Sequence, residues 1–243
     1  MLQKTEAIVL NRIKYGDSSY IINLYSREFG KFSTLVRILS GKRKGDHMNP
    51  NLFTPLNILE TEVELKNTRN IQIIKYCNRI NVLKNINNDI FKISIAQFIA
   101  EIISKTVREE EPNNTLYDFI EETILLLENA QGMISNIHVL FLKEFSKVIG
   151  FGITNNYCRE TPYFNFREGM FLPLFTYKEE ALNLDDSKIL SDILDINYPD
   201  VNNIRLTYIG RKKLLEIFLK YYEIHILRLN DLKSFKVLNE VFS

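Results

Sequence analysis

The chain has 243 residues, 45% of them hydrophobic and 25% charged, a composition ordinary for a globular protein and a length sufficient for two domains. Its two cysteines, Cys77 and Cys158, stand far apart, which excludes a disulfide framework and a cysteine-based metal motif. The net charge of +1 is uninformative by itself, because the two parts of the chain differ in sign.

Charge is distributed unevenly along the chain. Residues 1–81 carry 13 Lys and Arg against 7 Asp and Glu, whereas residues 82–243 carry 18 against 23. A basic front on an acidic remainder suits a protein that meets a polyanion with one end only.

Five strand patterns follow one another in the first part of the chain. They are rich in β-branched residues or alternate apolar with polar positions, and they cover residues 7–14, 20–27, 31–39, 58–65 and 71–80. The turn residues Tyr15 to Ser19 separate the first two. Five strands with a longer connection between the third and the fourth are typical of a small Greek-key barrel of the OB type. An SH3-like barrel would give a similar pattern.

A basic segment lies in that longer connection. Lys42, Arg43 and Lys44 stand between two glycines, Gly41 and Gly45. Such a loop can follow a phosphate backbone, because Lys and Arg neutralise phosphates without reading sequence. The alternative is a solvated run of charge.

The remainder of the chain is mainly helical in pattern. The apolar period predicts helices over residues 87–106, 115–130, 134–149, 185–196, 207–226 and 234–242. Asn88 or Asp89 is a candidate N-cap for the first of them, and Asp185 to Ser187 for the fourth. Residues 150–177 are rich in glycine, proline and aromatic residues, which predicts a loop and a β-hairpin. We therefore expect an α+β protein with a barrel domain over residues 1–81 and a helical domain over residues 82–243.

Two stretches of the chain resemble the ends of the bacterial DNA repair protein RecO family. The first runs from Thr5 to Lys31 and includes Lys14-Tyr15-Gly16-Asp17-Ser18-Ser19 and Tyr25-Ser26-Arg27-Glu28-Phe29-Gly30-Lys31. The second runs from Arg211 to Leu238 and includes Arg211-Lys212-Lys213-Leu214-Leu215, Tyr221-Tyr222, His225 and Leu232-Lys233-Ser234-Phe235-Lys236-Val237-Leu238. The order of elements between them agrees, so the resemblance covers essentially the whole chain.

The resemblance implies an OB-fold domain followed by a helical domain, and a non-enzymatic role in recombinational repair. Such proteins bind single- and double-stranded DNA and anneal complementary strands. They associate with RecR and with the C-terminal tail of single-strand-binding protein, and they help to load RecA recombinase. Many members carry a four-cysteine zinc module after the third helix. Residues 150–177 hold only Cys158 here, so we expect neither a structural zinc nor a cofactor.

Ten cations are the candidate DNA contacts. The loop residues Lys42, Arg43 and Lys44 come first, and the others on the barrel strands are Arg12, Lys14, Arg27, Lys31 and Arg37. Arg211 and Lys212 open a helix, where a cation opposes the helix dipole, which indicates a second DNA or acidic-tail contact or else a solvated helix face. Aromatic residues on which bases could stack, or which could simply fill the core, are Tyr15, Tyr20, Phe32 and Tyr76.

Parts of the sequence are also compatible with two other classes of protein. Glu60, Glu62 and Glu64 share one strand face, which would suit a metal-dependent nuclease or merely an outward polar edge. No histidine pair, phosphate-binding glycine loop or nucleophile motif accompanies them, so an enzyme is not expected. A non-catalytic scaffold whose barrel binds protein is the main alternative.

The start of the chain lacks the apolar core of a signal peptide and no run of 18 apolar residues occurs, so we expect a cytoplasmic, nucleoid-associated protein that does not bind membranes.

Overall fold

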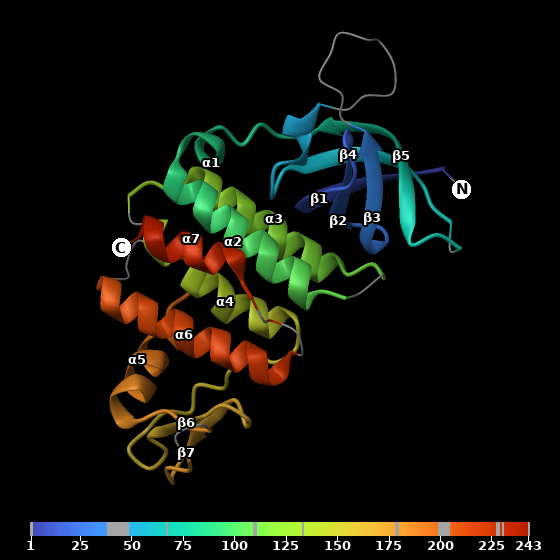
Figure 1. Ribbon diagram of the computed structural model, residues 1–243. Helices are drawn as coiled ribbons and strands as arrows, with labels where there is room; N and C mark the ends of the chain where they lie inside the picture. The colour runs from blue at the N-terminus through green and yellow to red at the C-terminus, as the bar shows by residue number, and fades with distance from the viewer. Residues whose placement is uncertain are drawn as a thin grey trace. The chain divides into compact units, whose positions relative to one another are not determined.

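The structure is a computed structural model that describes most of the chain (Figure 1). The described residues are 2–37, 49–66, 68–108, 111–132, 134–177, 180–198, 205–226, 229 and 231–242. Two compact units divide at Ile124 and Leu125, within helix α3. The barrel ends at Arg79, close to the change of pattern at residue 81, and an independent domain over residues 1–81 stays a prediction.

Unit 1 begins with five strands that close into a barrel. They are β1 (Leu2–Lys14), β2 (Ser19–Ser26), β3 (Gly30–Arg37), β4 (Ile58–Glu64) and β5 (Ile71–Arg79). Hydrogen bonds join them in the order β1-β2-β3-β5-β4, and β1 returns to pair with β4. All pairs are antiparallel except β3 with β5. The predicted α+β fold with an amino-terminal OB barrel is confirmed.

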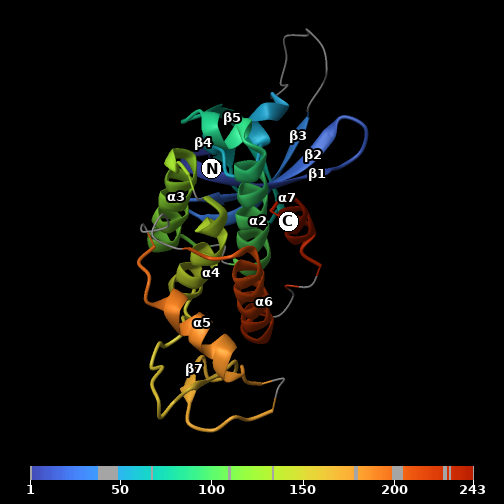
Figure 2. The same cartoon turned by 90° about the vertical axis from the view of Figure 1, so that its left-hand side faces the viewer.

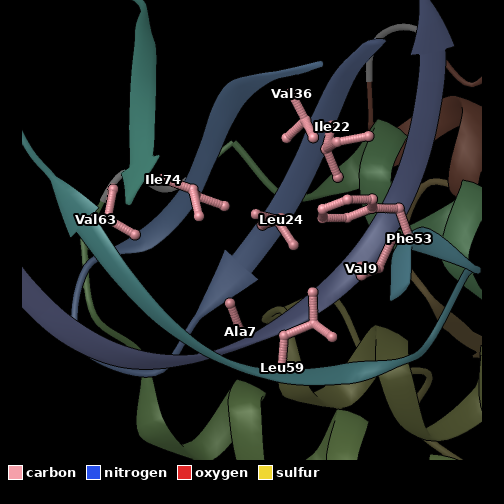
Figure 3. Close-up of a cluster of buried hydrophobic side chains, with 9 residues drawn as sticks. All are labelled: Ala7, Val9, Ile22, Leu24, Val36, Phe53, Leu59, Val63 and Ile74. Atoms are coloured by element: carbon pink, nitrogen blue, oxygen red, sulfur yellow. The ribbon is translucent and has the colours of Figure 1, made fainter. Parts of the chain in front are cut away.

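Alternation along the strands fills the barrel. In β3, Thr34 and Val36 are buried while Leu35 and Arg37 are exposed, as the period of two predicts. Strand β1 starts earlier than predicted, because Leu2 pairs with Glu64 of β4 and extends the ladder. Figure 3 shows side chains from all five strands and from the 3-10 turn η1 (Pro50–Phe53) converging on one core, whose members are Ala7, Val9, Ile22, Leu24, Val36, Phe53, Leu59, Val63 and Ile74.

Three helices follow the barrel in unit 1, and the last of them contains the boundary with unit 2. They are α1 (Lys84–Asn88), which the sequence did not predict, α2 (Ile90–Thr106) and α3 (Asn114–Asn129). Asp89, one of the two predicted caps, accepts hydrogen bonds from the backbone N–H groups of Phe91 and Lys92. Helix α2 packs against β1, and Asn11 of β1 donates to the Ser104 hydroxyl of α2 at 2.8 Å.

Unit 2 is built mainly from helices α4 (Ile137–Val148), α5 (Leu184–Leu194), α6 (Tyr208–His225) and α7 (Lys233–Val241). Figures 1 and 2 both show α4 alongside α6, which pack together. The predicted helix over residues 134–149 begins with a separate 3-10 turn, η2 (Ile134–Asn136). Asn183 caps α5 in place of the predicted Asp185 to Ser187, because its side chain accepts from the Asp186 N–H. None of the helices in the described ranges is long and apolar enough to cross a bilayer.

The segment over residues 150–177 forms the predicted hairpin, β6 (Tyr163–Asn165) and β7 (Met170–Leu172). The Asn156 amide donates to the Phe171 carbonyl at 2.9 Å and accepts from the Phe171 N–H at 2.8 Å. Phe164 of β6 packs against Phe171 and against Tyr221 of α6, with ring centroids 5.4 and 5.8 Å apart. Apolar rings and one asparagine therefore hold the hairpin to its neighbours.

Cys158 lies exposed in this segment, with its Sγ atom 3.1 Å from the Thr161 hydroxyl. Over the parts of the chain that the structure describes, no group of three or more His, Cys, Asp or Glu side chains could hold a metal ion.

His138 of α4 is buried, with its ring 5.7 Å from that of Phe242. Burial, and then the nearby charge of Arg211, lowers the pKa of His138 to about 3, from an ordinary value of 6.5. The folded state thus keeps the imidazole neutral, whereas the unfolded chain binds a proton below about pH 6.5. Stability from this residue is complete above pH 6.5 and is lost as the pH falls toward 3.

We expect the free energy of unfolding to fall by about 2 kcal/mol between pH 7 and pH 5 through His138 alone. Urea unfolding at the two pH values measures this effect. The His138→Gln variant, which cannot titrate, should show a pH dependence smaller by that amount. Equal pH dependence in both proteins would contradict the assignment.

Candidate nucleic-acid interface

Arg12 and Lys14 lie near the end of β1, at one end of the barrel. Their strand partners, Ile22 and Tyr20, place them on the face whose deeper residues form the core. Both cations are exposed. The Arg12 guanidinium lies 5.2 Å from the centre of the Tyr20 ring, and its Nη1 donates to the Pro50 carbonyl at 3.2 Å. Arg12 therefore presents charge beside an aromatic ring, an arrangement that suits phosphate and base together.

Arg37 lies at the same end of the barrel but on the opposite face of the strands. It pairs with Ser19 and shares its outward face with the exposed Leu35. Arg37 is itself exposed and is the last residue of β3. The surface around Arg37 therefore combines one positive charge with apolar side chains.

The predicted loop residues Lys42, Arg43 and Lys44 fall outside the described residues. The chain is described again from Asn49, next to the Pro50 carbonyl that Arg12 binds. Arg37 and Asn49, the described residues that flank this segment, both lie toward the end of the barrel that carries Arg12 and Lys14.

Arg27 has a different environment, set by the helices. Its guanidinium forms ion pairs with Glu6 at 3.6 Å, with Asp118 at 2.6 Å and with Glu121 at 3.1 Å. It also lies 4.1 Å from the centre of the Tyr117 ring. Burial opposes its charge, but the hydrogen bond to Asp118 and the surrounding carboxylates outweigh that effect and raise the pKa of Arg27. This cation is occupied by contacts that join β2 to α3.

Lys31 is likewise engaged within the chain. Its Nζ donates to the carbonyl of Val107 at 2.9 Å and to that of Ser104, both at the end of α2. Burial, and then the positive charge of Arg108, lowers the pKa of Lys31. The ammonium group therefore caps a helix end and fixes α2 to the barrel.

Arg211 and Lys212 belong to unit 2. Arg211 is half-buried, donates to the Ser135 hydroxyl at 3.2 Å and lies 5.7 Å from the centre of the Phe242 ring. Burial lowers the pKa of Arg211. Lys212 is exposed. Of the pair, the geometry leaves Lys212 open to an external anion.

Two of the four candidate aromatic residues are exposed and two are partly buried. Tyr15 and Tyr76 have 58% and 46% of their surface exposed. Tyr20 is half-buried under Arg12, and Phe32 packs against Phe29 and the barrel core. The structure therefore offers two open rings and two that partly support the core.

Two of the three glutamates of β4 form ion pairs. Lys4 binds Glu62 at 3.3 Å, and Lys66 binds Glu64 at 3.2 Å. Glu60 is exposed. All three carboxylates lie on the less buried face of β4.

Sequence reasoning missed three cations that the fold brings near Lys31. Lys66 and Arg69 come from the β4–β5 turn, and Arg108 follows α2. The turn was recognisable in the sequence, but its proximity to β3 depends on the parallel pairing of β3 with β5.

Comparison with known proteins identifies the family. The family model described as "Recombination protein O N terminal" matches residues 1–83, and "Recombination protein O C terminal" matches residues 87–234. The chain belongs to the RecO family. A DNA repair protein RecO from Azobacteroides pseudotrichonymphae is 34% identical over 242 residues, covering 100% of both chains. Those from Flavobacterium psychrophilum and Phocaeicola vulgatus are 32% and 30% identical, over 99% and 100% of each chain. The resemblance to the RecO family that the sequence shows is thus confirmed.

Replacing Arg27 by alanine should destabilise the protein by about 1–3 kcal/mol, because three carboxylates lose their shared partner in a partly buried setting. Urea unfolding measures this loss. Arg37→Ala is the matched control: Arg37 is exposed, and we expect a change within about 0.5 kcal/mol. Equal stability of the two variants would contradict a structural role for Arg27.

Proposed function

We propose that this chain is a DNA repair and recombination mediator that binds single- and double-stranded DNA and anneals complementary strands. One observation carries the proposal on the barrel side. Arg12, Lys14 and Arg37 lie at the end of the barrel where β1 and β3 end, and Arg37 is the last described residue before the segment that carries Lys42, Arg43 and Lys44. Family membership supports the same function.

The mechanism is electrostatic. Cations on the barrel would neutralise phosphates and release condensed counterions, which gives affinity without sequence preference. Two strands held on such a surface repel each other less, so that complementary bases pair without a chemical step. Arg27 and Lys31 are left out of this surface, because contacts within unit 1 occupy them.

Protein partners enter the proposal through the family. RecR, the C-terminal tail of single-strand-binding protein, and RecA recombinase as the loaded protein are the partners we propose, and association with the nucleoid would follow from DNA binding. The exposed Lys212 on α6 suits an acidic tail or a second DNA contact. We propose no catalytic activity and no cofactor.

A non-catalytic scaffold is the second candidate function. Ile13 and Leu35 lie on the outward face of the β1–β3 strands and have 52% and 40% of their surface exposed. An apolar patch of this kind can dock a protein. DNA binding that is absent or insensitive to salt would favour the scaffold.

Changing Lys42, Arg43 and Lys44 together to alanine should weaken binding to single-stranded DNA and flatten its salt dependence. Each lost phosphate contact lowers the slope of log affinity against log salt by about 0.7. Titration of a fluorescent oligonucleotide at several salt concentrations, with chelator present, measures both quantities.

The matched control replaces three cations outside the proposed surface, Lys84, Arg159 and Lys236, and thus removes the same charge. We expect the control to keep a slope close to that of the unmodified protein. A loop variant with an unchanged slope would remove these residues from the interface, and degradation of the oligonucleotide upon addition of magnesium would contradict a non-catalytic role.

A further inference from the structure

The turn between β1 and β2 carries an aromatic side chain at one end of the barrel (Figure 2). All residues from Arg12 to Asp17 are exposed, and Tyr15 has 58% of its surface open to solvent. Over the described ranges of the chain, no other ring and no cation lies against the Tyr15 ring. A large flat ring therefore stands on a convex turn, where it does not contribute to the core.

The backbone of this turn is held by the strands on both sides. The ladder between β1 and β2 continues to the pair Lys14 and Tyr20, and the Tyr15 N–H donates to the Ser19 carbonyl at 2.8 Å. Gly16 follows with a φ of 79°, a left-handed conformation that glycine adopts without strain. The backbone at Tyr15 is thus ordered before any ligand arrives, which lowers the entropic cost of binding.

The charged residues around the ring differ in sign with their position. Arg12 and Lys14 lie on one face of β1, about 7 Å apart along the strand, and the Pro50 carbonyl restrains Arg12. Asp17 places an exposed carboxylate in the turn itself. A carboxylate repels a phosphate, whereas the face of a base carries no net charge. The arrangement therefore favours phosphates beside the two cations and bases at Tyr15.

We propose that the β1–β2 turn binds the open end of a DNA duplex, with the Tyr15 ring stacked on the terminal base pair and with Arg12 and Lys14 beside the last phosphates. Aromatic rings stack on bases of any sequence. A terminal pair presents two coplanar bases that are already ordered, so a ring on a convex turn meets a flat surface without the entropy loss of ordering a flexible strand. Interior pairs are covered by their neighbours. The inference rests on the proposed function and specifies which form of DNA this turn contacts.

Such a contact would assist the proposed annealing. The end pairs of a newly formed duplex open readily, because they are stacked on one side only. A ring that covers the end replaces the missing stacking and slows the separation of the strands.

The test uses two duplexes of the same base-pair sequence. One is closed at both ends by hexaethylene glycol linkers, and the other is closed at one end only, so that it alone has a terminal base pair. We expect the unmodified protein to bind the open duplex about tenfold more tightly than the closed one. Equal affinity for the two duplexes would overturn the inference.

Three variants assign the preference to the ring. In Tyr15→Ala the two affinities should become equal, while Tyr15→Phe should keep the difference because phenylalanine also stacks. The matched control is Tyr177→Ala, which removes a tyrosine with 77% of its surface exposed in unit 2 and should keep the difference. None of the three changes alters the charge, so the salt dependence should stay the same, and thermal unfolding verifies that each variant is folded.

A second readout detects the stacking directly. The open duplex carries 2-aminopurine at its terminal pair, and we expect its fluorescence to fall on binding to the unmodified protein but not to Tyr15→Ala. If the unmodified protein binds no DNA, the proposed function and this inference both fail. If it binds DNA, the inference alone is overturned when Tyr15→Ala keeps the preference for the open duplex. It is also overturned when that variant loses as much affinity for single-stranded DNA as for the open duplex, because the ring would then stack on unpaired bases.

Discussion

The attachment of the barrel to the helices that follow it depends on two cations at the β2–β3 turn. Arg27 binds two carboxylates of α3 and one of β1, and Lys31 binds the last carbonyls of α2. Both are partly removed from water, where charge–charge and charge–dipole attraction is stronger than at the surface. These contacts tie the helices to the barrel within unit 1. They also remove two cations from the set that could meet a phosphate backbone.

The basic character of residues 1–81 thus has two physical uses. Some cations hold the protein together, and others remain at the surface. Burial and partner geometry separate the two groups, with Arg27 at one extreme and Arg37 at the other. Arg12, Lys14 and Arg37, all exposed, lie at the end of the barrel where β1 and β3 end. A count of charges along the chain cannot make this distinction, because it treats every lysine and arginine alike.

The periodicity of apolar residues predicted most strands and helices. The contacts that it did not predict join residues far apart in the sequence. All five strands were predicted, because the alternation of buried and exposed residues is visible within each short segment, as in β3. The fold assigned Arg27 to Asp118 and Lys31 to Ser104 across separations of 91 and 73 residues, which no local pattern reveals. The same holds for Lys66, Arg69 and Arg108, which the fold brings near Lys31 from separate parts of the chain. The sequence predicted that a polar side chain caps the start of α5, but it placed the cap too late in the chain. The cap is Asn183, because its side chain accepts a hydrogen bond from the Asp186 N–H in the first turn of the helix.

The hairpin over residues 150–177 has a consequence for the conditions under which the protein works. Its cohesion comes from the Asn156 amide, from aromatic rings packed edge to face and from the turn at Gly169, where a Cβ atom would lie 2.5 Å from the Tyr221 hydroxyl. None of these contacts involves a thiolate, and the one cysteine of the segment, Cys158, sits at its surface. Peroxide and other oxidants convert exposed thiolates to sulfenic and sulfinic acids. Because aromatic rings and an amide hold the hairpin, such a change at Cys158 would leave the contacts that shape it in place.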